Sequence, residues 1–69
     1  MEMISSSRDL ANVGLSRDEI VVLHGALNEI CHGIEVFEFE TRIGVNVEFA
    51  RNLLQALGSV LDGMDHLSG

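Results

Sequence analysis

Three side chains with ligand or nucleophile chemistry, His24, Cys31 and His32, lie within nine residues of one another. Imidazole and thiolate are common zinc ligands, and the two groups can also pair as base and nucleophile. His24 and Cys31 share one helical stripe but are seven residues apart, too far along a helix to chelate one ion. We therefore expect no metal site, a Cys31 that packs as a small apolar residue, and an interfacial His24.

Carboxylates are the other candidate for chemistry, because Glu35, Glu38 and Glu40 are close in sequence. Paired carboxylates can act as general acid and base. The chain has no Ser-His-Asp order and no glycine-rich phosphate loop to accompany them. The sequence predicts no catalytic residue, no cofactor and no enzymatic activity.

Composition limits the possible partners and the cellular compartment. The chain has 69 residues, 46% of them hydrophobic, with three Phe and no Trp or Tyr, which predicts one small domain with an aliphatic core. Four basic against eleven acidic residues give a net charge of -7, which disfavours nucleic acid and anionic membranes as partners. The single Cys31 excludes an intrachain disulfide, and no apolar run approaches the roughly 20 residues of a membrane span. We expect a cytoplasmic protein.

The elements that position these residues are predicted to be mainly helical. Residues 1–14 read as a flexible arm or a short strand-like extension. A helix is expected over Arg17–His32, because Ser16 and Glu19 fit a capping box and Gly33 is suited to a left-handed C-terminal position. The 34–44 segment alternates like a strand yet also fits one or two helical turns, and we favour a short helix or turn.

A second long helix begins after an Asn46 that can cap it, and Gly63 or the segment after it is predicted to end the helix. Gly58 inside this helix suggests close approach of another backbone. Its apolar stripe recurs at spacings of three and four residues. The stripe consists of Ala50, Leu53, Leu54, Leu57, Val60, Leu61 and Met64.

These patterns predict an all-α fold. Two antiparallel amphipathic helices joined by a short helical or turn segment would form a single helical-hairpin domain over 15–69. One such pair cannot close a core, so we expect a homodimer in a four-helix arrangement. The expected dimer interface comprises Leu53, Leu57, Val60, Leu61 and Met64.

The segment between the helices is the expected contact with another protein. Aromatic residues surrounded by charges are typical of interface hot spots. The residues concerned are Val36, Phe37, Glu38, Phe39, Glu40 and Arg42. Phe39 could equally plug the end of the helix pair, and Arg42 could instead pair with a nearby Glu. Val22 marks a second candidate patch on the first helix.

An acidic binder suits a partner with a basic surface, such as a nuclease toxin or a DNA-binding regulator.

A helix-turn-helix regulator is the alternative function. Phe39–Asn46 followed by Val47–Leu54 has the pattern of a helix, a glycine-centred turn and a second helix. The would-be recognition helix begins with Glu48 and offers only Arg51 to DNA, so nucleic acid remains the weaker expectation.

The runs ALNEICHG over 26–33 and FEFETRIGV over 37–45 resemble a group of short bacterial proteins, some of them similar to immunity proteins. The resemblance covers about half the chain and excludes its first fourteen residues. It implies a cytoplasmic binder that neutralises another protein by occupying its surface, as immunity proteins and phage-encoded antagonists of host regulators do.

Overall fold

A computed structural model describes residues 1–68. It contains two strands, β1 (Glu2–Ser6) and β2 (Ala11–Gly14), followed by three helices, α1 (Arg17–Gly33), α2 (Val36–Ile43) and α3 (Val47–Ser68). The predicted all-α fold is therefore wrong, because an antiparallel two-stranded sheet precedes a unit of three helices. Residue 69, the end of the predicted 15–69 domain, lies outside the described residues.

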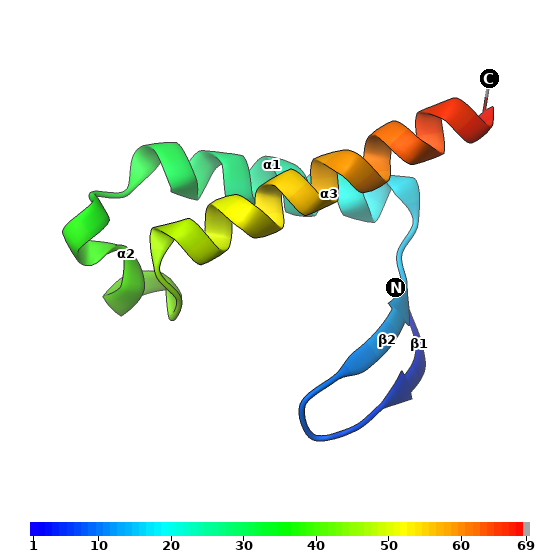
Figure 1. The fold of residues 1–69 in the computed structure, drawn as a ribbon, viewed down its shortest axis with the longest axis horizontal. Helices are drawn as coiled ribbons and strands as arrows, with labels where there is room; N and C mark the ends of the chain where they lie inside the picture. Colours follow the sequence, from blue (N-terminus) through cyan, green and yellow to red (C-terminus); the bar gives the residue numbers. More distant parts are fainter. Residues whose placement is uncertain (69) are drawn as a thin grey trace.

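The sheet is a hairpin whose strands pair Met3 with Val13 and Ser6 with Ala11. The register has an irregularity between Met3 and Ser5. All residues of β1 are exposed, so no buried face imposes the alternation that would have marked it as a strand. The backbone N–H of Ser7 donates to the carbonyl oxygen of Leu10 at 2.7 Å, which closes the turn. The hairpin extends away from the helices, and neither strand packs against one (Figure 1).

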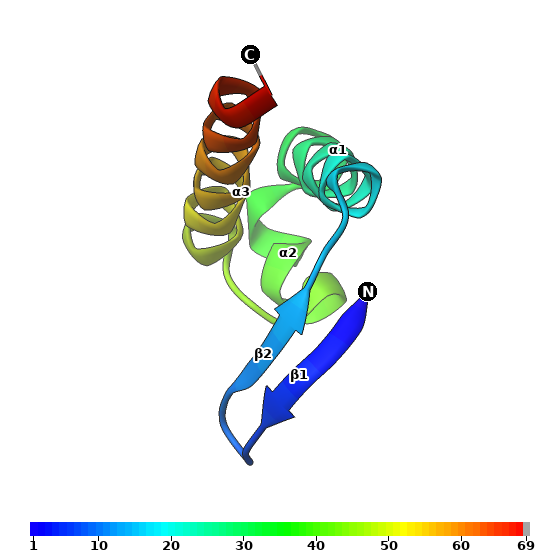
Figure 2. The same cartoon turned by 90° about the vertical axis from the view of Figure 1, so that its right-hand side faces the viewer.

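The helices α1 and α3 run antiparallel and side by side, and α2 crosses beneath one end of the pair (Figures 1 and 2). The predicted capping box is present at the start of α1. The Ser16 hydroxyl accepts from the Glu19 N–H at 3.2 Å, and the Glu19 carboxylate accepts from the Ser16 N–H at 2.8 Å. At the start of α3, Asn46 Oδ1 accepts from the Phe49 N–H at 2.8 Å, which confirms the predicted Asn46 cap.

The predicted left-handed conformation of Gly33 is wrong. Gly33 is the last residue of α1 and has no positive φ; α1 ends because Ile34 adopts an extended backbone with φ -113°. The left-handed glycine is Gly44 at φ 100°, whose N–H donates to the Glu40 carbonyl at 2.8 Å and separates α2 from α3. Helix α3 continues through Gly63 to Ser68, and an ion pair between Asp65 and Arg17 ties its last turns to the start of α1.

The core is small and lies where α2 meets the long helices. Phe39 is completely buried there, against Cys31 of α1 and Ala50 of α3. Apolar side chains that are partly buried surround this centre: Leu27, Ile30, Ile34, Val45, Val47 and Leu54. Ile20 is buried nearer the start of α1. The short helix favoured for 34–44 is confirmed, and its function in the fold is to carry Phe39 into this core.

Candidate protein-interaction surfaces

The expected partner-binding residues of α2 lie on different sides of that helix. Successive helical residues are rotated by about 100°, so Phe37 is about 200° from Phe39. Phe39 is 0% exposed and Phe37 is 81% exposed. Phe39 therefore plugs the helix pair and has no surface left for a partner, whereas Phe37 projects into solvent.

Val36 and Glu40 adjoin Phe37 on the exposed side of α2. Glu40 is four residues after Val36 and three after Phe37, the spacings that make helical side chains neighbours. Val36 is 64% exposed and Glu40 is exposed too. We call Val36, Phe37 and Glu40 the Phe37 patch. It combines two apolar side chains with one carboxylate.

Glu38 and Arg42 lie on a third side of α2, four residues apart. Both are exposed, and no ion pair joins them in the described part of the chain. No ion pair in the described residues joins Arg42 to any other nearby Glu, so the internal pairing considered for Arg42 is not formed, and its side chain is exposed on this third side.

The five residues expected at a dimer interface divide between two stripes of α3. The inner stripe packs toward α1 and contains Leu57, Leu61 and Met64, all half-buried. Leu53 and Val60 are 44% and 48% exposed and belong to a second stripe. This outer stripe consists of Phe49, Leu53, Ala56, Val60 and Leu67, all exposed.

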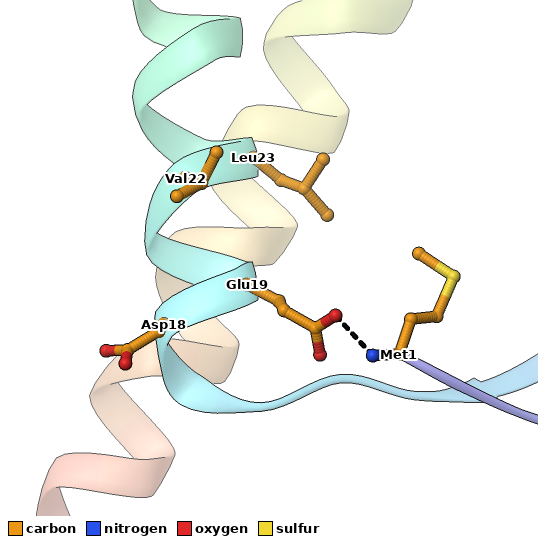
Figure 3. A pocket seen from close by; sticks show the side chains of 5 residues that line it. All are labelled: Met1, Asp18, Glu19, Val22 and Leu23. Atoms are coloured by element: carbon orange, nitrogen blue, oxygen red, sulfur yellow. Dashed lines mark hydrogen bonds and ion pairs between the residues drawn. The ribbon is translucent and has the colours of Figure 1, made fainter.

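A shallow hollow of about 330 Å³ lies where the start of the chain meets α1 (Figure 3). Its lining consists of the apolar side chains of Met1, Val22 and Leu23 and the acidic residues Asp18 and Glu19. Val22, the second patch expected from the sequence, is thus part of this hollow. The Met1 ammonium group forms an ion pair with the Glu19 carboxylate. That ammonium and the Ser16 N–H together hold the pKa of Glu19 below its ordinary value.

The candidate metal ligands are engaged in packing and local hydrogen bonds. Cys31 is a buried free thiol in the core. His24 faces Gly58, where an added Cβ would lie 3.4 Å from Nε2, so the close neighbour inferred for Gly58 is a side chain rather than a backbone. His32 Nδ1 donates to the Asn28 carbonyl at 2.7 Å. Among residues 1–68, no three His, Cys, Asp or Glu side chains gather as a metal site would require.

Sequence reasoning missed the outer stripe as a separate feature, although its positions 49, 53, 56 and 60 show the alternating spacing of a packed helix seam. The sequence merged Leu53 and Val60 with the inner stripe, because both stripes are apolar and adjacent. The hollow beside Met1 had no sequence indication beyond Val22, because it depends on where the hairpin places the start of the chain.

Compared with protein-family models, curated proteins and solved structures, the chain matches none of them. No helix within residues 1–68 is both long enough and apolar enough to cross a bilayer.

Proposed function

We propose that this protein is a small acidic binding module that inhibits or antagonises a partner protein by stoichiometric binding. The observation that carries the proposal is the 81% exposure of Phe37 on a helix anchored by the completely buried Phe39. An exposed aromatic ring is energetically costly in water, and a helix held by its own core residue presents that ring in one position. Aromatic residues presented in this way are typical binding hot spots.

Charge supports a partner with a basic surface. The chain carries a net charge of -7, and Glu35, Glu38 and Glu40 are all exposed around Phe37. Such a field accelerates the approach of a positively charged partner and repels acidic ones. A nuclease toxin or a DNA-binding regulator fits this description. The resemblance of the 26–33 and 37–45 runs to proteins similar to immunity proteins supports the same class, and the free Cys31 thiol suits the cytoplasm.

The helix-turn-helix alternative has less support. The order α2, Gly44 turn and α3 matches that motif in outline. At the start of α3, however, the exposed side chains near Arg51 include Glu48 and Phe49, which offer DNA phosphates no second cation. We therefore treat capture of nucleic acid as the outcome that would replace the proposal.

The test is affinity capture from a lysate of the native host with a tagged chain, followed by titration of the captured protein. Phe37→Ala is expected to weaken binding by about 1–3 kcal/mol, which is about 5- to 150-fold. Its far-ultraviolet circular dichroism is expected to be unchanged, because the ring contributes little to the core.

Val21→Ala serves as the matched control, because Val21 is also exposed but lies on α1, outside the Phe37 patch. Equal affinities of Phe37→Ala and Val21→Ala would contradict the proposed contact. Capture of nucleic acid that is lost in Arg51→Ala would instead establish the alternative function.

A further inference from the structure

We propose that a second copy of this chain covers the side of the α1–α3 pair that carries the outer stripe of α3. Phe49, Leu53 and Val60 are between 44% and 57% exposed there, in a helix whose neighbouring inner stripe is already packed. This is a different surface from the Phe37 patch, and the inference does not depend on the proposed function.

Both long helices have a second apolar row next to the packed one. In α3 the outer row at 49, 53, 56 and 60 precedes the inner row at 50, 54, 57 and 61 by one residue each. In α1 the row at 23, 26 and 30 precedes His24, Leu27 and Cys31 in the same way. Because α1 and α3 are antiparallel, rows displaced in the same rotational sense fall on the same side of the pair. The two rows therefore form one continuous surface, which we call the uncovered face.

Helix α2 and the hairpin project from the same side of the α1–α3 pair (Figures 1 and 2). Leu23 borders the hollow beside Met1, at the hairpin end (Figure 3). Ile30 contacts the cluster around Phe39, at the α2 end. Apolar surface thus extends between the two projections, with Ala26 and the outer stripe of α3 in the middle.

The molecule exposes more surface than a compact monomer of its mass does. The chain exposes 5449 Å², whereas a compact monomer of this mass exposes about 4250 Å². Its radius of gyration is 13.7 Å, against about 11 Å for a compact domain of this length. The projecting hairpin, whose residues are almost all exposed, contributes to this excess of about 1200 Å², so the excess is an upper limit for the area of the uncovered face. That limit exceeds the roughly 800 Å² that each partner buries in an interface of standard size.

A second copy fits this face better than a basic partner does. The outer stripe of α3 contains no charged residue, although the chain as a whole carries -7. In α1 the same offset includes Glu19, whose carboxylate forms an ion pair with the Met1 ammonium. A basic partner would be selected by carboxylates, which surround the Phe37 patch instead. A face that meets its own copy across a twofold axis must avoid like charges, and an apolar row with seam spacing satisfies that requirement.

Sedimentation equilibrium of the full chain tests the proposal. The wild type is expected to sediment at twice the 7.5 kDa mass of one chain at micromolar concentration. Val60→Glu places a carboxylate on the uncovered face and is expected to weaken association by about 100-fold or more, because an unpaired buried charge is strongly unfavourable. Ser59→Glu adds the same charge next to it on an exposed position outside both stripes and is expected to leave the mass unchanged.

The wild-type measurement keeps the test decisive even if Val60→Glu does not fold. A folded wild type that sediments as a single chain up to about 1 mM, the concentration of a very weak complex, would overturn the proposal. Equal weakening by Val60→Glu and Ser59→Glu would also overturn it, because the effect would then follow net charge rather than the uncovered face. Phe37→Ala is expected to leave the dimer mass unchanged. The proposed dimer and the proposed partner binding can therefore be disproved independently.

Discussion

At the residue scale, two phenylalanines of one short helix have opposite surroundings. Phe37 and Phe39 are separated by a single glutamate, and the alternation Phe37-Glu38-Phe39-Glu40 would place both rings on one face of a strand. In a helix the same spacing directs them to nearly opposite sides. The sequence could identify both as candidates for core or contact, but the assignment required the conformation of the 34–44 segment.

Replacing the buried ring is expected to unfold most of the molecule. Phe39→Ala removes a completely buried side chain at the junction of all three helices, a change that costs about 3–5 kcal/mol in well-packed cores. A domain with so small a core has little more net stability than that. Urea denaturation followed by circular dichroism measures the loss, with Phe37→Ala as the comparison. A Phe39→Ala variant as stable as the wild type would show that the ring does not hold the helices together.

At the element scale, local signals were sufficient for the starts of α1 and α3 and insufficient for the hairpin. Ser16 with Glu19 and Asn46 with Phe49 are caps formed within four residues, so sequence alone could predict them. The sheet depends on pairing Met3 with Val13 across ten residues, and β1 is exposed on both faces, so its sequence carries no alternation. How far α3 continues past Gly63 was also beyond prediction, because the Asp65–Arg17 contact that holds its last turns joins residues 48 positions apart.

The N-terminus of α1 is expected to make stability depend on pH through Glu19. The ion pair with the Met1 ammonium and the Ser16 N–H lower the pKa of Glu19 in the folded state. A lowered folded pKa means that this carboxylate stabilises the fold fully above its ordinary pKa of 4.5, and that the contribution is lost as the pH falls through the lowered value. Glu19→Gln keeps the capping hydrogen bond without the charge and is the matched control.

Urea denaturation at a series of pH values below about pH 5 measures this dependence. The wild type is expected to lose more stability on acidification than Glu19→Gln does. Parallel curves for the two proteins would mean that the Glu19 charge contributes nothing to the folded state.

At the scale of the whole molecule, the helical unit has a small core. Four apolar side chains are buried in the described residues: Ile20, Cys31, Phe39 and Ala50. The sequence predicted a core too small for one chain, because length and composition set that limit. It could not show which apolar residues would be left over. The inner and outer stripes of α3 became distinct once α1 was seen to occupy one of them.

If a second copy covers the uncovered face, thermal stability is expected to rise with protein concentration. Association that occurs only in the folded state shifts the unfolding equilibrium by mass action. Melting curves of the wild type over a hundredfold range of concentration measure the shift, and the Tm of Ser59→Glu is expected to rise in parallel. A constant Tm for the wild type would indicate that one chain holds the fold alone.

The separation of the hairpin from the helices has an evolutionary consequence. Neither strand packs against a helix, so a substitution in β1 or β2 removes no core contact from the helical unit. Residues 2–14 can therefore vary without loss of the helical core, provided that the strands still pair and keep Met1 beside Glu19. A lineage that preserves this pairing can change the other hairpin residues without compensating mutations in the core.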